Sequence, residues 1–325
     1  MQGPPFTSAK TLTALAAVSL AALVAGIAPA RADCAKLQAD FAQAVAAKSL
    51  DDAQKIEKKA NTDITCETAD RTKIRGLRID LTLSLLDDPA GPLKTDAQRE
   101  QALVDAATPA VSWRAASRLG DFRFLQRRYG EAIAFYTEAV RRAGDKDITS
   151  SGLTPVQTSQ LLKRTAAANA LAVDDGGGTK EVPKEFKMAI RDVGPKGGVF
   201  SPIFKTRGAV IMPIPVPINF LVGKAVFTPG GAEMADQLVQ VLIEEKPEQI
   251  TLIGHTDPSG TDDYNLWLSD QRVHAVAKYL SDHGVVVKIT MVAKGKREPF
   301  DISSLPSKPT QDEAWALDRR VEMIH

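Results

Sequence analysis

An aspartate and an arginine fifteen residues apart are the pair in this chain best suited to hold a charged ligand. Asp257 follows the apolar segment 249–253, and Arg272 lies in a segment whose apolar residues recur at helical spacing. Arg272 is four residues from both Leu268 and Val276, which places its guanidinium on the apolar face of that helix. A guanidinium at a core must be paired and hydrogen-bonded. An acid and a guanidinium at the edge of a core can receive a zwitterion: the carboxylate takes an ammonium and the guanidinium a carboxylate.

Alternating strands and helices are expected to position these two side chains. The pattern predicts strands at 218–220, 249–253, 288–293 and 320–324, with helices at 232–245 and 262–283. Such alternation builds a two-layer α/β sandwich with its helices on one face. The loop 256–260 follows the carboxyl end of a strand, where ligand sites often lie in layered α/β folds. Residues 301–314 read as a polar loop insertion before the last strand.

Several separated blocks in the last third of the chain occur in the order and spacing of a known family. They are Ile253-Gly254-His255-Thr256-Asp257, Gly260, Asn265, Leu268-Ser269, Arg272, Ala275-Val276, Tyr279-Leu280, Gly284, Gly295, Pro299 and Arg319-Arg320-Val321-Glu322. From about residue 217 to the C-terminus, the chain resembles the OmpA-like peptidoglycan-binding domain. The resemblance implies a βαβαβ-type domain at 217–325 that binds the diaminopimelate side chain of uncrosslinked peptidoglycan stems.

The resemblance also implies roles for individual residues. The binding aspartate and arginine of the family match Asp257 and Arg272, and its asparagine and second arginine fall on Asn265 and Arg320. Thr256, in the same loop as the aspartate, completes the expected peptidoglycan-binding set. Departures from the family pattern do not touch the Asp257/Arg272 pair; they are Lys224, Gln271, Val273 and Asp318.

Simpler structural roles remain open for the same side chains. Asp257 before Pro-Ser-Gly could only cap a turn, and Arg272 could pair with Asp318 or Glu322. We expect one of Arg319 and Arg320 to face the site and the other to face solvent. His255 is expected to be buried in the fold rather than to bind a metal. Trp267 and Trp315 are expected to be packing residues rather than platforms for a sugar. No catalytic residue, metal site or cofactor is predicted.

The N-terminus predicts export to the periplasm. Lys10 precedes the uncharged run 11–27, and Ala30-Arg31-Ala32 is a small-x-small cleavage signature, so 1–32 are expected to be a signal peptide. An uncleaved anchor helix is the alternative. Two cysteines in an exported chain predict the disulfide Cys34–Cys66, worth about 3 kcal/mol or more, with two free buried thiols as the alternative. Without Lys10 and Arg31, the chain has 39 basic against 40 acidic side chains, which argues against nucleic acid as a partner.

Residues 33–173 are Ala-rich and helical in period, which predicts an all-α N-terminal domain and an α+β class for the whole chain. One segment has tetratricopeptide-like spacing and an earlier one echoes it; a plain helical bundle is the alternative. These residues are Leu119-Gly120, Tyr129, Ala132, Tyr136 and Ala139, and then Leu50, Ala53 and Ala60. Seven arginines could form a solvated helix face or a groove for an acidic peptide: Arg114, Arg118, Arg123, Arg127, Arg128, Arg141 and Arg142.

Residues 174–216 read as a linker, beginning with Asp174-Asp175-Gly176-Gly177-Gly178. Within it, 199–204 and 209–212 could form short strands. Alternating prolines predict an extended segment at 212–218, at the edge of a sheet.

Together these features predict a periplasmic, non-enzymatic protein, associated with the wall or outer membrane. It would bind diaminopimelate stems through Asp257 and Arg272, and an envelope protein through its helical domain. The first alternative is a wall-processing enzyme that uses the domain for targeting, although 34–173 contain no histidine. The second is an interaction scaffold whose wall site is degenerate. Alanine at Asp257 or Arg272 is expected to abolish retention on sacculi without unfolding the domain.

Overall fold

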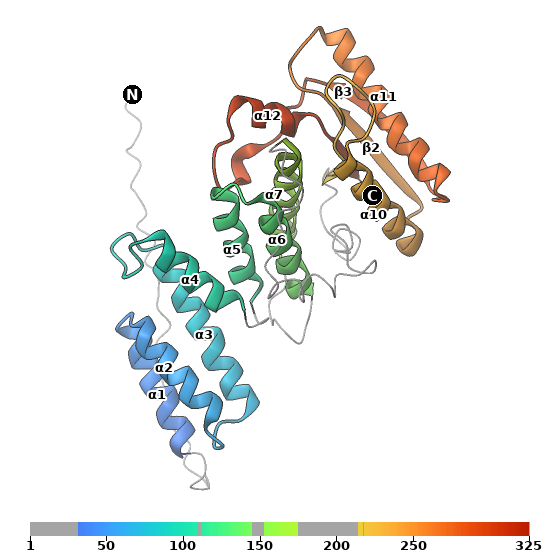
Figure 1. Ribbon diagram of the computed structural model, residues 1–325. Coiled ribbons are helices and arrows are strands. Elements are labelled where there is room, and N and C mark those ends of the chain that lie inside the picture. Colours follow the sequence, from blue (N-terminus) through green and yellow to red (C-terminus); the bar gives the residue numbers. More distant parts are fainter. Residues whose placement is uncertain (1–31, 109–111, 145–152, 175–213, 217, 325) are drawn as a thin grey trace, which may run out of the picture.

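The computed structural model describes residues 32–108, 112–144, 153–174, 214–216 and 218–324. The expected signal peptide and the candidate strands at 199–204 and 209–212 lie outside these residues. A helical half is followed by a smaller α/β half, as predicted (Figure 1). In the described part of the chain, no helix combines the length and apolar character needed to cross a membrane.

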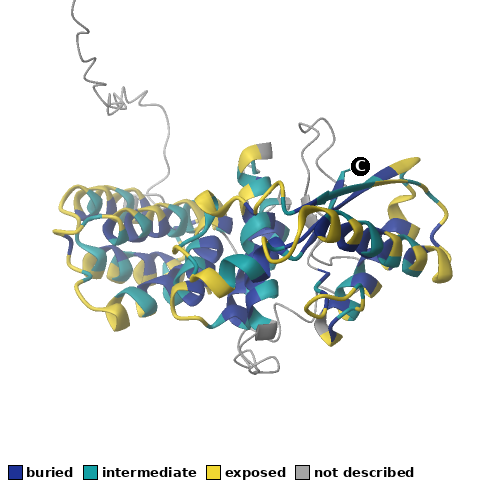
Figure 2. Ribbon diagram, turned by 90° about the horizontal axis from the view of Figure 1, so that it is seen from above, coloured by how far each residue is buried: buried dark blue, intermediate teal, exposed yellow. Residues whose placement is uncertain are grey.

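Seven helices of the described chain form the N-terminal half. They are α1 (Ala32–Ala46), α2 (Leu50–Thr62), α3 (Thr68–Leu86), α4 (Asp96–Ala107), α5 (Trp113–Leu125), α6 (Tyr129–Gly144) and α7 (Pro155–Asp174). Hydroxyl side chains start several of them: Ser49, Thr95 and Ser112 each accept a backbone hydrogen bond from the first turn that follows. Consecutive helices pack against each other, with their buried sides turned inward (Figure 2).

The tetratricopeptide-like spacing corresponds to the hairpin of α5 and α6. Tyr136, Ala132 and Ala139 are fully buried in its seam. Gly120 allows the close approach, because a Cβ there would lie 2.6 Å from the Tyr136 ring. The Tyr136 hydroxyl donates to Asp121 Oδ1 at 2.9 Å. In the earlier segment with similar but weaker spacing, Ala53 is fully buried in α2. It belongs to a separate core that α2 shares with α1 and α3.

Gly120→Ala therefore tests the packing of this hairpin. The added methyl group collides with Tyr136, a buried ring held by its hydrogen bond to Asp121. We expect a loss of about 1–3 kcal/mol in the free energy of unfolding, as for overpacked cores, despite the better helix propensity of alanine. Urea denaturation of the full chain measures it, with Gly76→Ala in α3 as control, since no atom lies within 4 Å of a Cβ there. A gain in stability at Gly120 like that at Gly76 would contradict the close approach.

The predicted disulfide is present in the structure. Cys34 in α1 is bonded to Cys66, just before α3, with Cα atoms 5.1 Å apart. Both residues are buried in the α1–α3 core. The bridge closes a loop with a sequence separation of 32, so it limits the freedom of the unfolded N-terminal helices.

The arginines of α5 and α6 are mostly neutralised within the fold. Arg123 pairs with Glu100 and Glu131, and Arg142 pairs with Glu138; both arginines are almost fully buried. Four other arginines also form ion pairs: Arg118–Asp87, Arg127–Glu313, Arg128–Glu131 and Arg141–Glu138. This segment is therefore neither a simple solvated face nor a strip of unpaired positive charge for an acidic peptide. Arg128–Glu131, Arg141–Glu138 and Arg142–Glu138 are three or four residues apart, as expected for pairs along one helix. Arg123–Glu100, Arg118–Asp87 and Arg127–Glu313 join distant parts of the chain, which spacing along the sequence does not show.

The C-terminal half is the expected two-layer α/β sandwich. Its elements are β1 (Ile214–Val216), α10 (Pro229–Glu245), β2 (Gln249–His255), α11 (Asp262–Asp282), β3 (Lys288–Gly295), η2 (Ile302–Ser304), α12 (Gln311–Asp318) and β4 (Val321–Ile324). The sheet order is β1-β4-β2-β3; β2 and β3 are parallel, and β4 is antiparallel to both β1 and β2. The edge strand expected among the prolines is β1. The strand predicted at 218–220 is wrong: Phe220 makes only an isolated bridge with Phe227.

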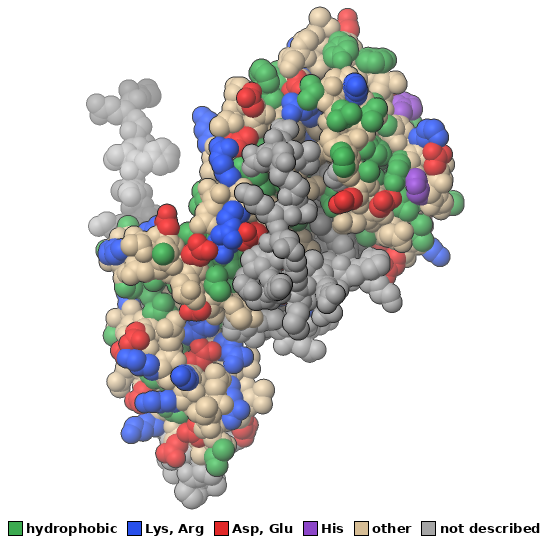
Figure 3. Space-filling view, viewed as in Figure 1, with side chains coloured by type: hydrophobic (Ala, Val, Ile, Leu, Met, Phe, Trp, Pro, Cys, Tyr) green, Lys and Arg blue, Asp and Glu red, His purple; other side chains and the backbone are tan. Residues whose placement is uncertain are grey.

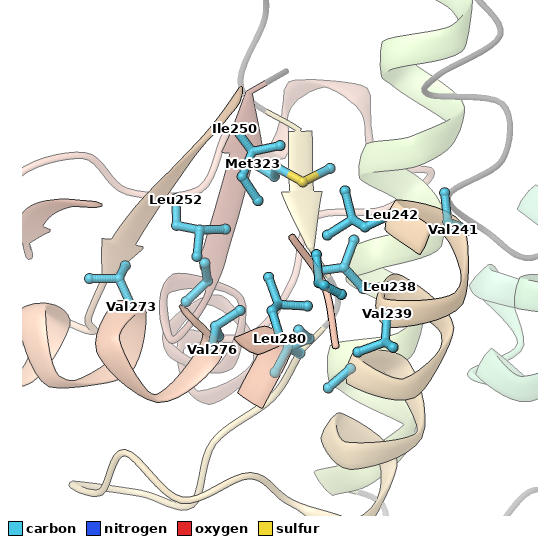
Figure 4. Close-up of a cluster of buried hydrophobic side chains, with 14 of the residues drawn as sticks. Leu238, Val239, Val241, Leu242, Ile250, Leu252, Val273, Val276, Leu280 and Met323 are labelled. Carbon is cyan, nitrogen blue, oxygen red and sulfur yellow. The ribbon is translucent and has the colours of Figure 1, made fainter. Parts of the chain in front are cut away.

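The core of this half lies between the sheet and the helices α10 and α11. Leu238 of α10, Leu252 of β2, Val276 of α11 and Met323 of β4 are fully buried and belong to one cluster (Figure 4). Gly254 permits β2 and α11 to approach closely, since a Cβ there would clash with the carbonyl oxygen of Ser269. The strand that ends at the candidate site is thus fixed directly against the helix that carries Arg272.

The segment predicted as a polar loop at 301–314 is partly helical, and it connects the α/β half to the helical half. It contains η2 and the start of α12, and Phe300 and Leu317 join the core of α5–α7. Arg164 Nε donates to the Ser304 carbonyl at 2.6 Å, and Arg127 pairs with Glu313 at 2.8 Å. The polar composition concealed this docking, because Leu305 alone among the described residues of this core lies inside the segment, while the buried Phe300, Ala316 and Leu317 lie just outside it.

Candidate ligand-binding site

Asp257 lies in the turn after β2, where its carboxylate is held from two sides. Oδ1 accepts from the Ser259 backbone N–H at 3.0 Å and from the Ser259 hydroxyl. Oδ2 accepts from Arg319 Nη1 at 3.2 Å. Asn265 Nδ2 donates to the Ser259 carbonyl at 2.7 Å, which fixes the turn to α11. Asp257 therefore does cap its turn, and it also faces an arginine from the other end of the domain.

The Asp257 carboxylate is anionic at neutral pH. Burial by itself raises its pKa, but the hydrogen bonds from Ser259 and Arg319, with the positive charge of Arg319, outweigh burial. The net result is a pKa below the ordinary value of 3.8. The side chain is 14% exposed, so the carboxylate remains in reach of a ligand.

Arg272 is fully buried on α11, as its place in the apolar stripe predicts. Its Nη1 donates to the His255 carbonyl at 3.1 Å and its Nε to the Lys224 carbonyl at 3.3 Å. The guanidinium carbon lies 5.2 Å from the centre of the Phe220 ring. Nη2 is buried and has no hydrogen-bond partner among the described residues.

The Arg272 guanidinium has no carboxylate at ion-pair distance within the described chain: it pairs with neither Asp318 nor Glu322. Burial, followed by the positive charge of Arg319, lowers its pKa to about 10, while the charge of Asp257 acts in the opposite direction. Arg272 therefore stays charged at neutral pH. A buried cation held mainly by carbonyl groups is short of a counter-charge, which an anionic ligand could supply.

Asp257 and Arg272 meet at one turn, although they do not bond to each other. Arg272 holds the carbonyl of His255, and Asp257 is two residues further along the chain. Arg319 touches Asp257, and its charge also acts on Arg272. We call Asp257, Arg272 and Arg319 the charge cluster. It combines one anion and two cations at the carboxyl end of β2.

The remaining predicted site residues surround this cluster in different ways. Thr256 is buried, its N–H donates to the Gly295 carbonyl at 3.0 Å, and its Oγ1 has no hydrogen-bond partner among the described residues. Asn265 supports the turn, as noted. Arg320 has other partners: its Nε donates to Glu322 at 2.8 Å and its Nη2 to the Glu298 carbonyl at 3.3 Å.

Sequence reasoning expected one of Arg319 and Arg320 to face the site and assigned the role to Arg320, whereas Arg319 is the arginine that contacts Asp257. The expectation that one of the two adjacent arginines faces solvent is wrong, because their side chains are only 14% and 9% exposed. A signal existed in the alternation of β4: Val321 and Met323 point to the helix layer that carries Arg272. Continuing that alternation backwards places Arg319 on the same side.

The aromatic and histidine expectations have mixed outcomes. His255 is fully buried as predicted, with its Nε2 3.4 Å from Glu322 Oε2. Trp267 is not a packing residue: it is 55% exposed. Within the described chain, no three His, Cys, Asp or Glu side chains gather in a way that could hold a metal ion.

The fold and the charge cluster define a small α/β module, fastened to a helical array, with a candidate site for a zwitterion. Residues 219–312 match the OmpA family, so the chain contains an OmpA family domain. This finding confirms the fold and the family expected from the separated sequence blocks.

Similar proteins align with the same third of the chain. The peptidoglycan-associated lipoprotein of Pseudomonas aeruginosa is 35% identical over 77 residues, 23% of this chain and 42% of that protein. Outer membrane protein A of Shimwellia blattae is 32% identical over 112 residues, 33% of this chain and 46% of that protein. The chain thus spans less than half the length of these relatives. Among solved structures, the peptidoglycan-associated lipoprotein from Burkholderia pseudomallei is 27% identical, with 33% of this chain and 86% of that chain covered and a TM-score of 0.29.

Proposed function

We propose that this chain is a non-catalytic peptidoglycan-binding protein of the periplasm, associated with the wall or outer membrane. Its α/β module binds diaminopimelate stem peptides, and its helical half docks an envelope protein. The observation that carries the wall-binding proposal is the buried Arg272 guanidinium, which has no carboxylate partner in the described chain and lies beside an anionic Asp257. The names of the relatives, a peptidoglycan-associated lipoprotein and an outer membrane protein, support the compartment and the ligand class.

The charge cluster suits the free end of diaminopimelate, which carries an ammonium and a carboxylate on one carbon. Asp257 would accept from the ammonium, while Arg272 would donate to the carboxylate. The loop carbonyl of Lys224 accepts from Arg272 Nε at 3.3 Å, so an incoming carboxylate would compete with it for the guanidinium. The ligand would therefore displace this weak contact to reach the guanidinium. Arg319 would keep Asp257 oriented during the exchange.

Affinity for a single stem is expected to be modest. Each charge-assisted hydrogen bond contributes roughly 1.5–3 kcal/mol, and part of that is lost in displacing the Lys224 carbonyl. Many stems on one polymer compensate for this by avidity. The proposal that the helical half binds a protein partner rests on its architecture alone. Crosslinking in the periplasm followed by mass spectrometry is the measurement that identifies this partner.

Asp257→Asn tests the proposed site with almost no change in shape. The amide keeps an oxygen for Ser259 but loses the charge that holds an ammonium. We expect retention of the mature protein on purified sacculi to fall by about ten- to a hundredfold, the equivalent of one charged hydrogen bond. Asp282→Asn is the matched control, since that carboxylate is exposed at the far end of α11 and pairs only with Lys278 in the described structure. Equal retention of both folded variants would reject the site.

A further inference from the structure

Two aromatic side chains stand exposed at the start of α11, and one of them, Tyr264, lies near Arg272 of the charge cluster. Tyr264 is 43% and Trp267 is 55% exposed, and their ring centres are 5.8 Å apart with planes tilted by 38°. Packing inside the domain does not require them, because the buried stripe of α11 is formed by other residues. Large exposed aromatic rings close together commonly mark a binding surface.

A shallow hollow of about 580 Å³ lies against Trp267. Trp267, Leu266 and Ala293 give it an apolar wall, while Asp263 and Asp270 add carboxylates. Trp267 is flanked by the two acids one helical turn away on either side. Figure 3 shows hydrophobic side chains exposed on the visible face of the α/β half, with charged side chains among them. The hollow thus offers a flat apolar surface with hydrogen-bond acceptors at its sides.

This combination fits a sugar ring better than a peptide side chain. A pyranose has a face of C–H groups that packs on an aromatic ring, and hydroxyl groups at its edge that donate to carboxylates. Three apolar residues and two carboxylates line the hollow, as expected for a ligand with one apolar face and a polar edge.

The hollow is connected to the charge cluster through Tyr264. The Tyr264 hydroxyl donates to the Gly223 carbonyl at 3.4 Å, and the next carbonyl, that of Lys224, accepts from Arg272. The same ring lies over the turn that holds Asp257, since a Cβ at Gly260 would be 3.3 Å from it. A ligand that joins a charged peptide to a sugar could therefore occupy both places at once.

We infer that Trp267 and Tyr264 form a subsite for the glycan strand of peptidoglycan, next to the stem site. The inference rests on the proposed function, because sugar and stem are parts of one polymer. Two amino acids separate diaminopimelate from the sugar-linked lactyl group, a span of roughly 7–11 Å for an extended chain. The subsite would select stems still attached to their glycan over free stem peptides.

Trp267→Ala in the mature full chain separates the two subsites. The probes are a disaccharide-tripeptide ending in diaminopimelate and the same tripeptide without sugar, both titrated by calorimetry. We expect affinity for the disaccharide-tripeptide to fall about five- to tenfold, and affinity for the free tripeptide to stay at the wild-type value. Trp267→Phe should restore most of the loss. Ile243→Ala, an exposed apolar residue of α10, is the control and should bind both probes normally.

The outcomes distinguish this inference from the proposed function. Equal binding of the disaccharide-tripeptide by Trp267→Ala and wild type would overturn the glycan subsite, and Asp257→Asn would still report on the stem site. Loss of both probes in Trp267→Ala would also overturn it, since the aromatic pair would then support the stem site or the fold. A change in oligomeric state on substitution, seen by sedimentation, would assign the surface to a second copy of the chain instead.

Discussion

Arg272→Met is expected to abolish retention on sacculi and to lower the stability of the α/β module. Methionine fills much of the same space but cannot donate to a ligand carboxylate or to the carbonyls of His255 and Lys224. It also lacks the positive charge beside Phe220 and Asp257. We expect the variant to bind at least a hundredfold more weakly, because a bidentate charged contact is removed. Two carbonyl groups left unpaired should cost about 2–3 kcal/mol of unfolding free energy.

The expected loss of unfolding free energy affects how the binding of such variants is interpreted. Truncation to alanine at a fully buried position would add a cavity, so the expectation that Arg272→Ala leaves the domain intact does not suit the structure. Binding of Arg272→Met should be measured where denaturation curves show it folded. Arg272→Lys is the matched control: it keeps the charge but loses the planar fork, so partial binding is expected. Wild-type retention of a folded Arg272→Met would show that the guanidinium does not hold the ligand.

Local pattern was sufficient to predict most of the α/β module. The stripe of Leu268, Arg272 and Val276 gave α11 its bounds to within a residue and its buried face. The proline-rich segment could be recognised as an edge strand, because Pro215 has no N–H to give to a neighbour on its outer side. The strand expected at 218–220 failed because a short apolar run there is buried by packing in the core rather than by strand pairing.

Sequence reasoning could not predict the contacts between distant parts of the chain. Asp257 and Arg319 are 62 residues apart, and Tyr129 and Glu313 are 184 apart. Both pairs involve α12 or the residue after it, and only the start of α12 belongs to the segment that reads as polar loop. The same element that docks on α5–α7 thus ends at the arginine that holds Asp257. Only the tertiary arrangement joins the helical half to the candidate site in this way.

The exposed aromatic pair shows a related limit of pattern reasoning. A tryptophan in a helix is usually assigned to packing, because large apolar side chains are mostly buried. Trp267 is one residue away from Leu268, so a small error in helix phase is enough to exchange a buried position for an exposed one. The stripe of Leu268, Arg272 and Val276 already fixes that phase, and it places Trp267 outside the buried face.

Glu322→Gln is expected to destabilise the α/β module at neutral pH and to change its response to acid. Glu322 Oε1 accepts from Arg320 Nε at 2.8 Å, and its Oε2 lies 3.4 Å from His255 Nε2. Burial alone would raise the pKa of Glu322, but His255 and the charge of Arg320 outweigh burial and lower it to about 2. The loss of this interaction should cost about 3 kcal/mol at pH 7.

The sign of the pH dependence follows from the lowered pKa. The unfolded chain binds a proton at Glu322 near pH 4.5, whereas the folded chain does so only near pH 2. The stabilisation is therefore complete above pH 4.5 and is lost as the pH falls towards 2. Urea denaturation at pH 7, 4 and 3 should show the gap between wild type and Glu322→Gln narrowing with acid. The unfolding free energy of Asp282→Asn, a change at an exposed carboxylate, should follow that of the wild type across this pH range. A gap of constant size across this range would mean that Glu322 contributes through packing rather than through its charge.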